Sequence, residues 1–172
     1  LVISTNAGLW RYMPGDTVRF TSTAPYRIQV SGRTRSFINA FGEELIVENA
    51  DRGMEAACSA TGALVREYTA DPIYMDAAAR GGHEWVVEFE RAPDDLERFV
   101  QVLDARMREL NSDYDAKRRG DRALMPPRVH VVPPGTFFQW MKERGKLGGQ
   151  NKVPRLCNDR TWLDQLLQPV LA

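Results

Sequence analysis

Apolar and polar residues alternate near the start of the chain, as they do in half-buried β-strands. The alternation runs through residues 17–23, stops at Pro25 and resumes over residues 26–31, which predicts a β-hairpin region. The polar run Gly32-Arg33-Thr34-Arg35-Ser36 follows, and its composition is typical of a linker. We interpret this run as a hinge between two parts of the chain.

The period of the apolar residues becomes helical after the hinge. One helix is predicted over residues 45–62, with its apolar residues on one side and a glycine at its end. A longer helix is predicted over residues 94–119, because apolar residues recur there at intervals of three and four. Its acidic start and basic end complement the helix dipole. Two short helices are predicted over residues 136–144 and 161–167.

Three strands are predicted in the same part of the chain, over residues 63–70, 83–90 and 128–132. One side of the middle strand carries His83, Trp85, Val87 and Phe89. The other side carries three glutamates and one apolar exception, Val86. We therefore predict that one face of this strand is buried and that the other faces water.

The order of elements after the hinge is helix, strand, strand, helix, strand, helix. This order predicts an α+β fold, a small sandwich in which helices cover one face of a mainly antiparallel sheet. A β-rich lead-in over residues 1–34 precedes the sandwich, which occupies residues 35–172.

Size and charge exclude several classes of protein. The chain has 172 residues and a mass of 19.5 kDa, which suits one compact domain with an appendage. Lys and Arg number 23, as do Asp and Glu, so the formal net charge is zero and no overall field attracts nucleic acid or an anionic membrane. No apolar run approaches the roughly 18 residues of a membrane helix. We expect neither nucleic acid nor a membrane as a partner.

The cysteines and the first residue add two expectations. Cys58 and Cys157 are the only cysteines, which is too few for a disulfide framework. A reducing, cytoplasmic location is therefore expected. The chain begins at Leu1 without a methionine, and we expect it to be part of a longer polypeptide.

Common catalytic motifs are absent from the sequence. It contains no P-loop, no G-x-G-x-x-G, no H-E-x-x-H, no C-x-x-C and no G-x-S-x-G. The two histidines, His83 and His130, fall on predicted strands without neighbouring cysteines. We interpret them as structural and expect no metal site within this chain.

Structural roles also account for several aromatic and acidic residues. Trp10, Trp85 and Trp140 are expected to pack in the core, because large aromatic side chains dominate the cores of small domains. Glu43 and Glu44 precede the first predicted helix, where carboxylates stabilise the helix dipole without any further function.

Three short segments carry side chains that can bind a nucleotide. Gly15 can take a positive φ in the turn Tyr12-Met13-Pro14-Gly15-Asp16, and Asp16 can then accept two ribose hydroxyls. Arg33 can reach a ribose or phosphate oxygen with its planar donors. Lys152 closes a glycine-containing loop and can deliver a point charge to an anionic oxygen. Each segment alone also fits an ordinary turn or a solvated loop.

Together and in this order, the segments resemble motifs of the adenylate-forming superfamily, which includes acyl-CoA synthetases, peptide-synthetase adenylation domains and luciferases. Tyr12-x-x-Gly15-Asp16 resembles its ribose-binding motif. The run from Gly32 to Gly42, followed by Glu48, resembles its hinge motif. Gly149-Gln150-Asn151-Lys152-Val153-Pro154-Arg155-Leu156 resembles its terminal lysine motif.

The wording of the motifs is similar to one family in particular. The runs Phe41-Gly42-Glu43-Glu44-Leu45 and Glu48-Asn49-Ala50, with the Gln-Asn-Lys-Val-Pro-Arg run, resemble the auxin-responsive "Gretchen Hagen" acyl acid amido synthetases. We expect the C-terminal part of a bacterial member.

The resemblance implies a two-step ATP-dependent reaction. A carboxylic acid and ATP with Mg²⁺ would give an acyl adenylate and pyrophosphate, and the amine of an amino acid would then displace AMP and form an amide. Asp16, in the turn with Tyr12 and Gly15, would accept the ribose hydroxyls, and Arg33 would support the same nucleotide. Lys152 would neutralise charge on the α-phosphate and the acyl oxygen.

The family architecture adds expectations about the domains. Arg35 takes the hinge position, where Asp or Lys is usual, and the small domain would rotate there between half-reactions. Residues 1–34 would be the tail of a large N-terminal domain, and residues 35–172 the mobile C-terminal domain. The N-terminal domain would supply the phosphate loop, the acyl pocket and most contacts to ATP and Mg²⁺. We expect these 172 residues alone to be inactive.

Two alternatives stay open. A thioester-forming ligase of the phenylacetate-CoA type would share the first half-reaction and every residue named above. A stand-alone binding or regulatory module would make the Asp16 turn and the Lys152 loop unrelated surface features.

Overall fold

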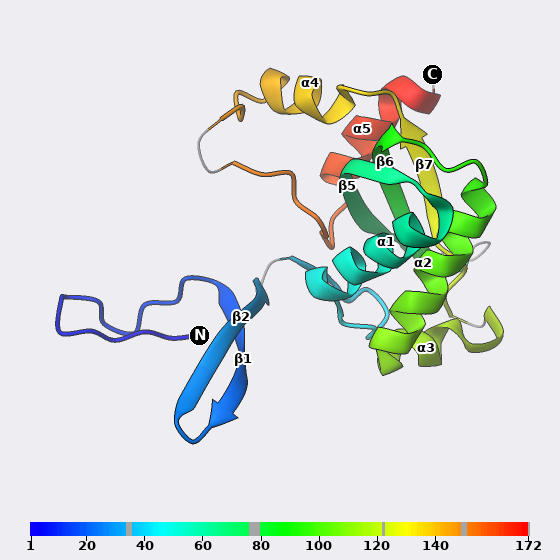
Figure 1. The fold of residues 1–172 in the computed structure, drawn as a ribbon. Coiled ribbons are helices and arrows are strands. Elements are labelled where there is room, and N and C mark those ends of the chain that lie inside the picture. Colours follow the sequence, from blue (N-terminus) through cyan, green and yellow to red (C-terminus); the bar gives the residue numbers. More distant parts are fainter. Residues whose placement is uncertain (34–35, 76–79, 122, 149–150, 172) are drawn as a thin grey trace.

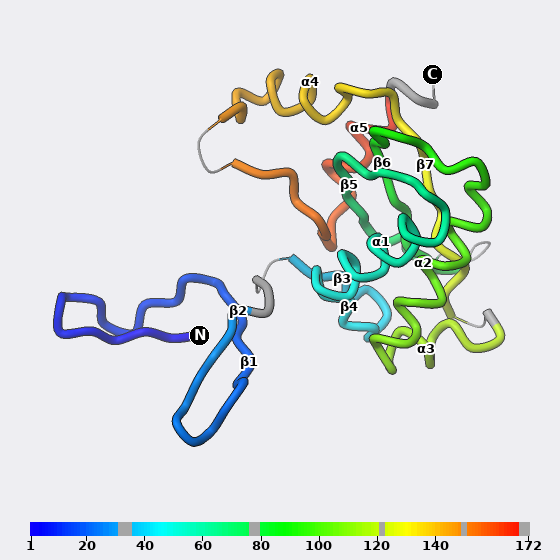
Figure 2. The backbone as a smooth tube through the Cα atoms, in the orientation of Figure 1, coloured from blue at the N-terminus to red at the C-terminus, as the bar shows by residue number. Residues whose placement is uncertain are grey.

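The computed structural model describes residues 1–33, 36–75, 80–121, 123–148 and 151–171 (Figure 2). The strands are β1 (Asp16–Thr23), β2 (Tyr26–Arg33), β3 (Phe37–Ile38), β4 (Leu45–Ile46), β5 (Leu64–Ile73), β6 (Gly82–Arg91) and β7 (Arg128–Val132). The helices are α1 (Val47–Thr61), α2 (Leu96–Leu110), α3 (Ser112–Arg118), the short η1 (Arg119–Asp121), α4 (Thr136–Glu143) and α5 (Thr161–Leu171). This mixture confirms the predicted α+β class.

The hairpin predicted near the start of the chain is present. Strands β1 and β2 pair antiparallel and project from the rest of the chain (Figure 1). Phe20 and Ile28 are register partners, as are Val18 and Val30, so the four side chains share one face. Phe20, Ile28 and Val30 are each at least half exposed. Exposed apolar faces of this kind are typical of surfaces that contact another protein or domain.

Helix α1 follows the predicted pattern closely. Its buried residues are Ala50, Gly53, Met54 and Ala57, and it ends at Gly62, whose φ is 68°. That left-handed conformation is available to glycine without steric cost, which is why the helix ends there.

The single helix predicted over residues 94–119 is wrong in one respect, because the structure divides it into α2 and α3 at Asn111. This residue is extended, with φ −139° and ψ 106°. Its side-chain amide donates to the carbonyls of Glu43 (2.8 Å) and Glu44 (3.2 Å), and its side-chain oxygen accepts the N–H of Tyr114 over 2.9 Å. Tertiary hydrogen bonds and a new N-cap therefore offset the loss of one helical turn.

The central sheet has the order β5-β6-β7. Strand β6 pairs antiparallel with β5 and parallel with β7. The hairpin and the small β3–β4 pair are antiparallel too, so most strand pairings among the described residues are antiparallel, as predicted.

Helices cover both faces of the central sheet, which corrects the prediction that they cover one. The first face packs under α1, α2 and α3 in a core that includes Trp85, Val87 and Phe89. The second face packs under α4 and α5 in a smaller core around Val86. Val86, the exception in the alternating pattern, is thus the centre of a second apolar layer. The prediction that this face is wet was wrong.

The tryptophans behave differently from one another. Trp85 and Trp140 are buried, as predicted, but Trp10 is 81% exposed, so its expected place in the core was wrong. No helix within the described part of the chain is long and apolar enough to span a bilayer.

Gly53 lets α1 approach α2 closely, and Gly53→Val should lower the free energy of unfolding by about 2 to 3 kcal/mol. A Cβ at this position would lie 2.9 Å from Cδ1 of Leu103 and 3.2 Å from Cγ of Met107, both fully buried. Urea denaturation of this chain measures the effect. Ala60→Val, at an exposed position of the same helix, should cost less than about 1 kcal/mol through helix propensity alone. Equal losses in the two variants would contradict the close packing.

Candidate functional site

Lys152 is exposed at the start of a segment that adds to the free edge of β5. The Ala70 N–H donates to the Arg155 carbonyl over 2.9 Å, and the Cys157 N–H donates to the Ala70 carbonyl over 3.2 Å. Leu156, between them, is fully buried and forms a parallel bridge with Ala70. The lysine therefore precedes a short stretch of backbone that the sheet fixes in place.

The Arg155 side chain is held by β5 as well. Its guanidinium lies 4.4 Å from the centre of the Tyr68 ring and donates to the Tyr68 carbonyl over 3.1 Å and to the Glu67 carboxylate. The Tyr68 hydroxyl donates to Asp51 of α1 over 2.5 Å. Burial and the nearby Asp51 raise the pKa of Tyr68, so the hydroxyl remains a donor at neutral pH.

An open pocket of about 450 Å³ lies between the lysine loop, α4 and strands β5 and β6. Its lining combines apolar and charged side chains, among them Arg66, Phe137, Phe138, Met141, Lys146 and Leu147. At its base the buried Glu88 carboxylate accepts the N–H groups of Gly135 (2.9 Å) and Phe137 (3.1 Å) at the start of α4. A carboxylate at this position satisfies free helix donors and opposes the helix dipole. Glu88 therefore holds the start of α4, the helix that precedes the lysine loop.

The residues predicted to bind the nucleotide ribose lie at or near the open end of the hairpin. Gly15 has the predicted positive φ, at 84°. Asp16 begins β1, half-buried, and is the register partner of Arg33 at the end of β2. Tyr12 is 52% exposed and forms an antiparallel bridge with Ile3.

Lys152 is carried by a different part of the chain. Figure 1 shows its segment leaving α4 and returning to the edge of β5, whereas the hairpin projects beyond α1. The structure therefore pairs Asp16 with Arg33 across the hairpin and places Lys152 in a different part of the domain. Arg35, the predicted hinge residue, lies outside the described residues.

The hairpin contacts the start of α1. Nη1 of Arg19 donates to the Glu48 carboxylate over 3.3 Å, and a groove of about 380 Å³ between the two elements is lined by Arg19, Val30, Glu48, Asp51 and others. Asp51, which accepts the Tyr68 hydroxyl, faces this groove. An exposed ion pair of this kind contributes little stability.

Comparison with known proteins gives the chain a family. The model of the GH3 family C-terminal domain matches residues 48–161, which is more than half of the chain. The chain belongs to the GH3 family. The model of the GH3 family central domain matches residues 1–33. GH3 is the "Gretchen Hagen" family that the motifs resemble, so the recognition is confirmed at this level.

Individual GH3 relatives support the assignment. An indole-3-acetic acid-amido synthetase of Oryza sativa subsp. indica, GH3.8, is 30% identical over 173 residues, which cover 90% of this chain and 27% of that protein. Another, GH3.4 of Arabidopsis thaliana, is 29% identical over 183 residues, which cover 97% and 30%. The structure of the GH3.15 acyl acid amido synthetase aligns with a TM-score of 0.74 at 20% identity and covers 96% of this chain and 31% of that one. The chain spans less than a third of the length of these relatives.

The two GH3 matches divide the motif residues. Tyr12, Gly15, Asp16 and Arg33 fall within the central-domain match, and Lys152 falls within the C-terminal match. Residues 34–47 lie between the two.

Sequence reasoning missed a buried carboxylate–imidazole contact in this GH3 domain. Glu43 is fully buried, and its carboxylate lies 2.9 Å from Nε2 of His83 and accepts the Phe41 N–H over 2.7 Å. Burial opposes ionisation, but His83 and these hydrogen bonds outweigh it and lower the pKa of Glu43. The expected role of Glu43 at the helix dipole was wrong, because α1 begins four residues later.

A second cluster surrounds Glu84 on the face of β6 that was expected to be wet. Its carboxylate lies 2.8 Å from Nε2 of His130 and 2.6 Å from Nη2 of Arg160. Burial opposes ionisation of Glu84, but these two partners outweigh it and lower its pKa. His130 therefore has the structural role that the sequence suggested, although it is half-buried rather than on the open surface.

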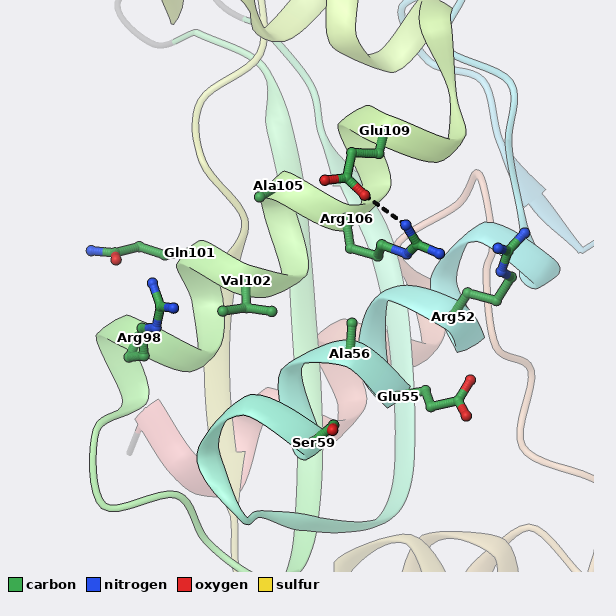
Figure 3. A pocket seen from close by; sticks show the side chains of 10 residues that line it. All are labelled: Arg52, Glu55, Ala56, Ser59, Arg98, Gln101, Val102, Ala105, Arg106 and Glu109. Carbon is green, nitrogen blue, oxygen red and sulfur yellow. Dashed lines mark hydrogen bonds and ion pairs between the residues drawn. The ribbon is translucent and has the colours of Figure 1, made fainter.

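A hollow of about 600 Å³ lies between α1 and α2 on the outer surface (Figure 3). It presents Arg52, Arg98 and Arg106, and Arg106 pairs with Glu109 over 2.6 Å. None of the motif residues lines it. Among the described residues no cluster of three or more His, Cys, Asp or Glu side chains could hold a metal ion.

Asp71 is buried on β5 beneath α5, and neither of its carboxylate oxygens has a hydrogen-bond donor among the described residues. Burial raises its pKa from an ordinary 3.8 to about 7. Arg160 and the dipole of the Leu163 N–H favour the charged form, whereas Asp159 and Asp164 oppose it. Asp71 lies next to Ala70, the residue that anchors the lysine segment.

Asp71→Asn should make the free energy of unfolding less dependent on pH between pH 4 and pH 7. The folded chain holds the Asp71 proton up to about pH 7, whereas the unfolded chain releases it near pH 4, so stability from this group is full at low pH and is lost as the pH rises. A pKa difference of this size corresponds to roughly 4 kcal/mol, the most that the variant should gain on the wild type at pH 8.

Urea denaturation of both proteins between pH 4 and pH 8 measures this difference. Asp94→Asn, which changes an exposed carboxylate, should follow the wild-type profile. Parallel profiles for wild type and Asp71→Asn would contradict the assignment of the raised pKa.

Proposed function

We propose that this chain is the C-terminal part of an ATP-dependent ligase that adenylates a carboxylic acid and transfers the acyl group to the amine of an amino acid. Membership of the GH3 family and relatives named as indole-3-acetic acid-amido synthetases support the proposal. The observation that carries it is the placement of Lys152, which is exposed at the end of a loop but is rooted by its neighbours on the edge of β5. The ammonium group of Lys152 is therefore accessible to a ligand, while the backbone that follows it is held on β5.

In the first step of this proposal, a carboxylate oxygen of the acid attacks the α-phosphorus of ATP. The bond from that phosphorus to the bridging oxygen breaks, and pyrophosphate leaves with Mg²⁺. In the second step the amino acid nitrogen attacks the acyl carbon, AMP leaves with the carboxylate oxygen, and the nitrogen loses a proton. The products are an amide, AMP and pyrophosphate.

The residues of this chain would bind and stabilise charge. Asp16 would accept the two ribose hydroxyls, because an ionised carboxylate is a strong bidentate acceptor. Arg33, its register partner, would support the same nucleotide, beside Tyr12 and Gly15. Lys152 would neutralise the negative charge that develops on the α-phosphate and the acyl oxygen, which stabilises the transition state without a proton transfer.

The proposal includes a large N-terminal domain in the same polypeptide, which supplies the acyl pocket and most contacts to ATP and Mg²⁺. The apolar face of the β1–β2 hairpin would be covered by that domain. Residues 35–172 would rotate about Arg35 between the half-reactions, and this chain alone would be inactive. A cytoplasmic location belongs to the same proposal, and a bacterial source stays a prediction, since the relatives named above are plant proteins.

In the full-length protein, Lys152→Ala and Asp16→Ala should each lower acid-dependent exchange between ATP and pyrophosphate at least tenfold. For Lys152, removal of one donor that stabilises a developing negative charge costs about 2 to 4 kcal/mol of activation free energy, which corresponds to this loss or a larger one. For Asp16, removal of the carboxylate leaves two ribose hydroxyls without their charged acceptor, and each such hydrogen bond contributes about 1.5 to 3 kcal/mol. The assay screens aryl, indolyl and fatty acids. Lys142→Ala and Asp94→Ala, which remove exposed charges elsewhere in the domain, are matched controls and should retain exchange.

Exchange that is indifferent to Lys152→Ala and Asp16→Ala would contradict the site assignment. A reading frame that starts near Leu1 would favour a stand-alone module instead, whereas several hundred residues upstream would support the ligase. The same preparation separates the two ligase classes, because an amide should form with an amino acid, and a thioester should form with coenzyme A if the alternative is correct.

A further inference from the structure

The backbone that follows Lys152 is anchored to β5 by three hydrogen bonds, one at Thr69 and two at Ala70. The Thr69 hydroxyl donates to the Pro154 carbonyl over 2.7 Å, and the two hydrogen bonds of Ala70 hold the residues on either side of Leu156. Lys152 is two residues before Pro154, so its Cα lies within about 7 Å of the first anchored residue. The position of Lys152 therefore depends on how firmly residues 154–157 are held against β5.

The side chain of Arg155 adds further contacts between this stretch and β5. Its guanidinium stacks on Tyr68 at 4.4 Å and bonds to both the Tyr68 carbonyl and the Glu67 carboxylate. The ring of Tyr68 is fixed in turn, because it is 3% exposed and its hydroxyl is bonded to Asp51. A planar guanidinium suits this site better than an ammonium group, since it can stack and donate in its plane at the same time.

The charge of Arg155 is already engaged by Glu67, whereas Lys152 is exposed. The two cations of this motif thus have different surroundings, and only the lysine is presented outward. A displacement of about 1 Å at a charge-stabilising group can cost as much as a hundredfold in rate, so loss of the Arg155 contacts should act through the lysine.

We propose that Arg155 is a positioning residue, which holds the Lys152 segment against Tyr68 and Glu67 so that the lysine meets the developing charge. The inference rests on the proposed function of Lys152 and adds a role for a residue that need not touch the substrate.

A double-mutant cycle in the full-length protein tests the inference. Acid-dependent exchange between ATP and pyrophosphate is measured over a range of ATP concentrations up to saturation for wild type, Arg155→Ala, Lys152→Ala and the double variant. Arg155→Ala should lower kcat at least tenfold with a change in KM for ATP of less than threefold. In the Lys152→Ala background the same change should lower kcat less than twofold, because nothing is left to position.

Two further variants distinguish loss of the Arg155 contacts from general unfolding of the domain. Arg155→Lys keeps the charge but not the planar stack, and it should restore part of the loss at Arg155→Ala. Arg98→Ala removes an exposed arginine of α2, in the outer hollow that none of the motif residues lines, and it should retain exchange. Urea denaturation checks that each variant is folded. If Arg155→Ala does not fold, the double-mutant cycle is repeated with Arg155→Lys in its place.

The outcomes separate the two proposals. If Lys152→Ala lowers exchange but Arg155→Ala lowers it by the same factor in both backgrounds, the positioning role is overturned and the proposed function stands. The positioning role is also overturned if Arg155→Ala retains full exchange. If Lys152→Ala itself has no effect, the proposed role of Lys152 fails and the positioning role falls with it. If no acid supports exchange, the proposed function fails as well.

Discussion

The domain depends on the burial of β6 on both of its faces. A strand in this position needs an apolar layer on each side, and the buried carboxylates that it carries need partners, because an unpaired buried charge is costly. His83 meets Glu43 of the segment before α1, Glu84 meets Arg160 at the start of α5, and Glu88 accepts the first N–H groups of α4. Three polar residues of one strand therefore fix three separate parts of the chain.

This arrangement places the lysine loop between two fixed ends. The loop leaves α4, which Glu88 holds, and it returns to the edge of β5 before α5, which Arg160 ties to Glu84. Between these points Lys152 is exposed. A loop that is fixed at both ends can present a cation reproducibly, and the proposed sequence of two half-reactions would need such a cation.

Local sequence patterns predicted several elements well. The apolar side of α1 and its end at Gly62 follow directly from residue spacing and from the conformational freedom of glycine. The hairpin, the strands β5 to β7 and the positive φ of Gly15 were predicted in the same way. The order of three motifs predicted the superfamily, and the residues within those motifs predicted the family. The division at Asn111 was missed, because the hydrogen bonds that cause it come from Glu43 and Glu44, more than sixty residues earlier.

By itself, the sequence determined the α+β class, most element boundaries and the candidate nucleotide-binding residues, since each of these depends on neighbours along the chain. Only the tertiary structure decided that the buried Glu43 and Glu84 contact His83 and Arg160, that Asp71 has no hydrogen-bond donor among the described residues, and that Arg155 stacks on Tyr68. These features arise between residues far apart in sequence. The sequence shows that a residue carries a carboxyl group, but the solvation of that group and its partners depend on how the chain packs.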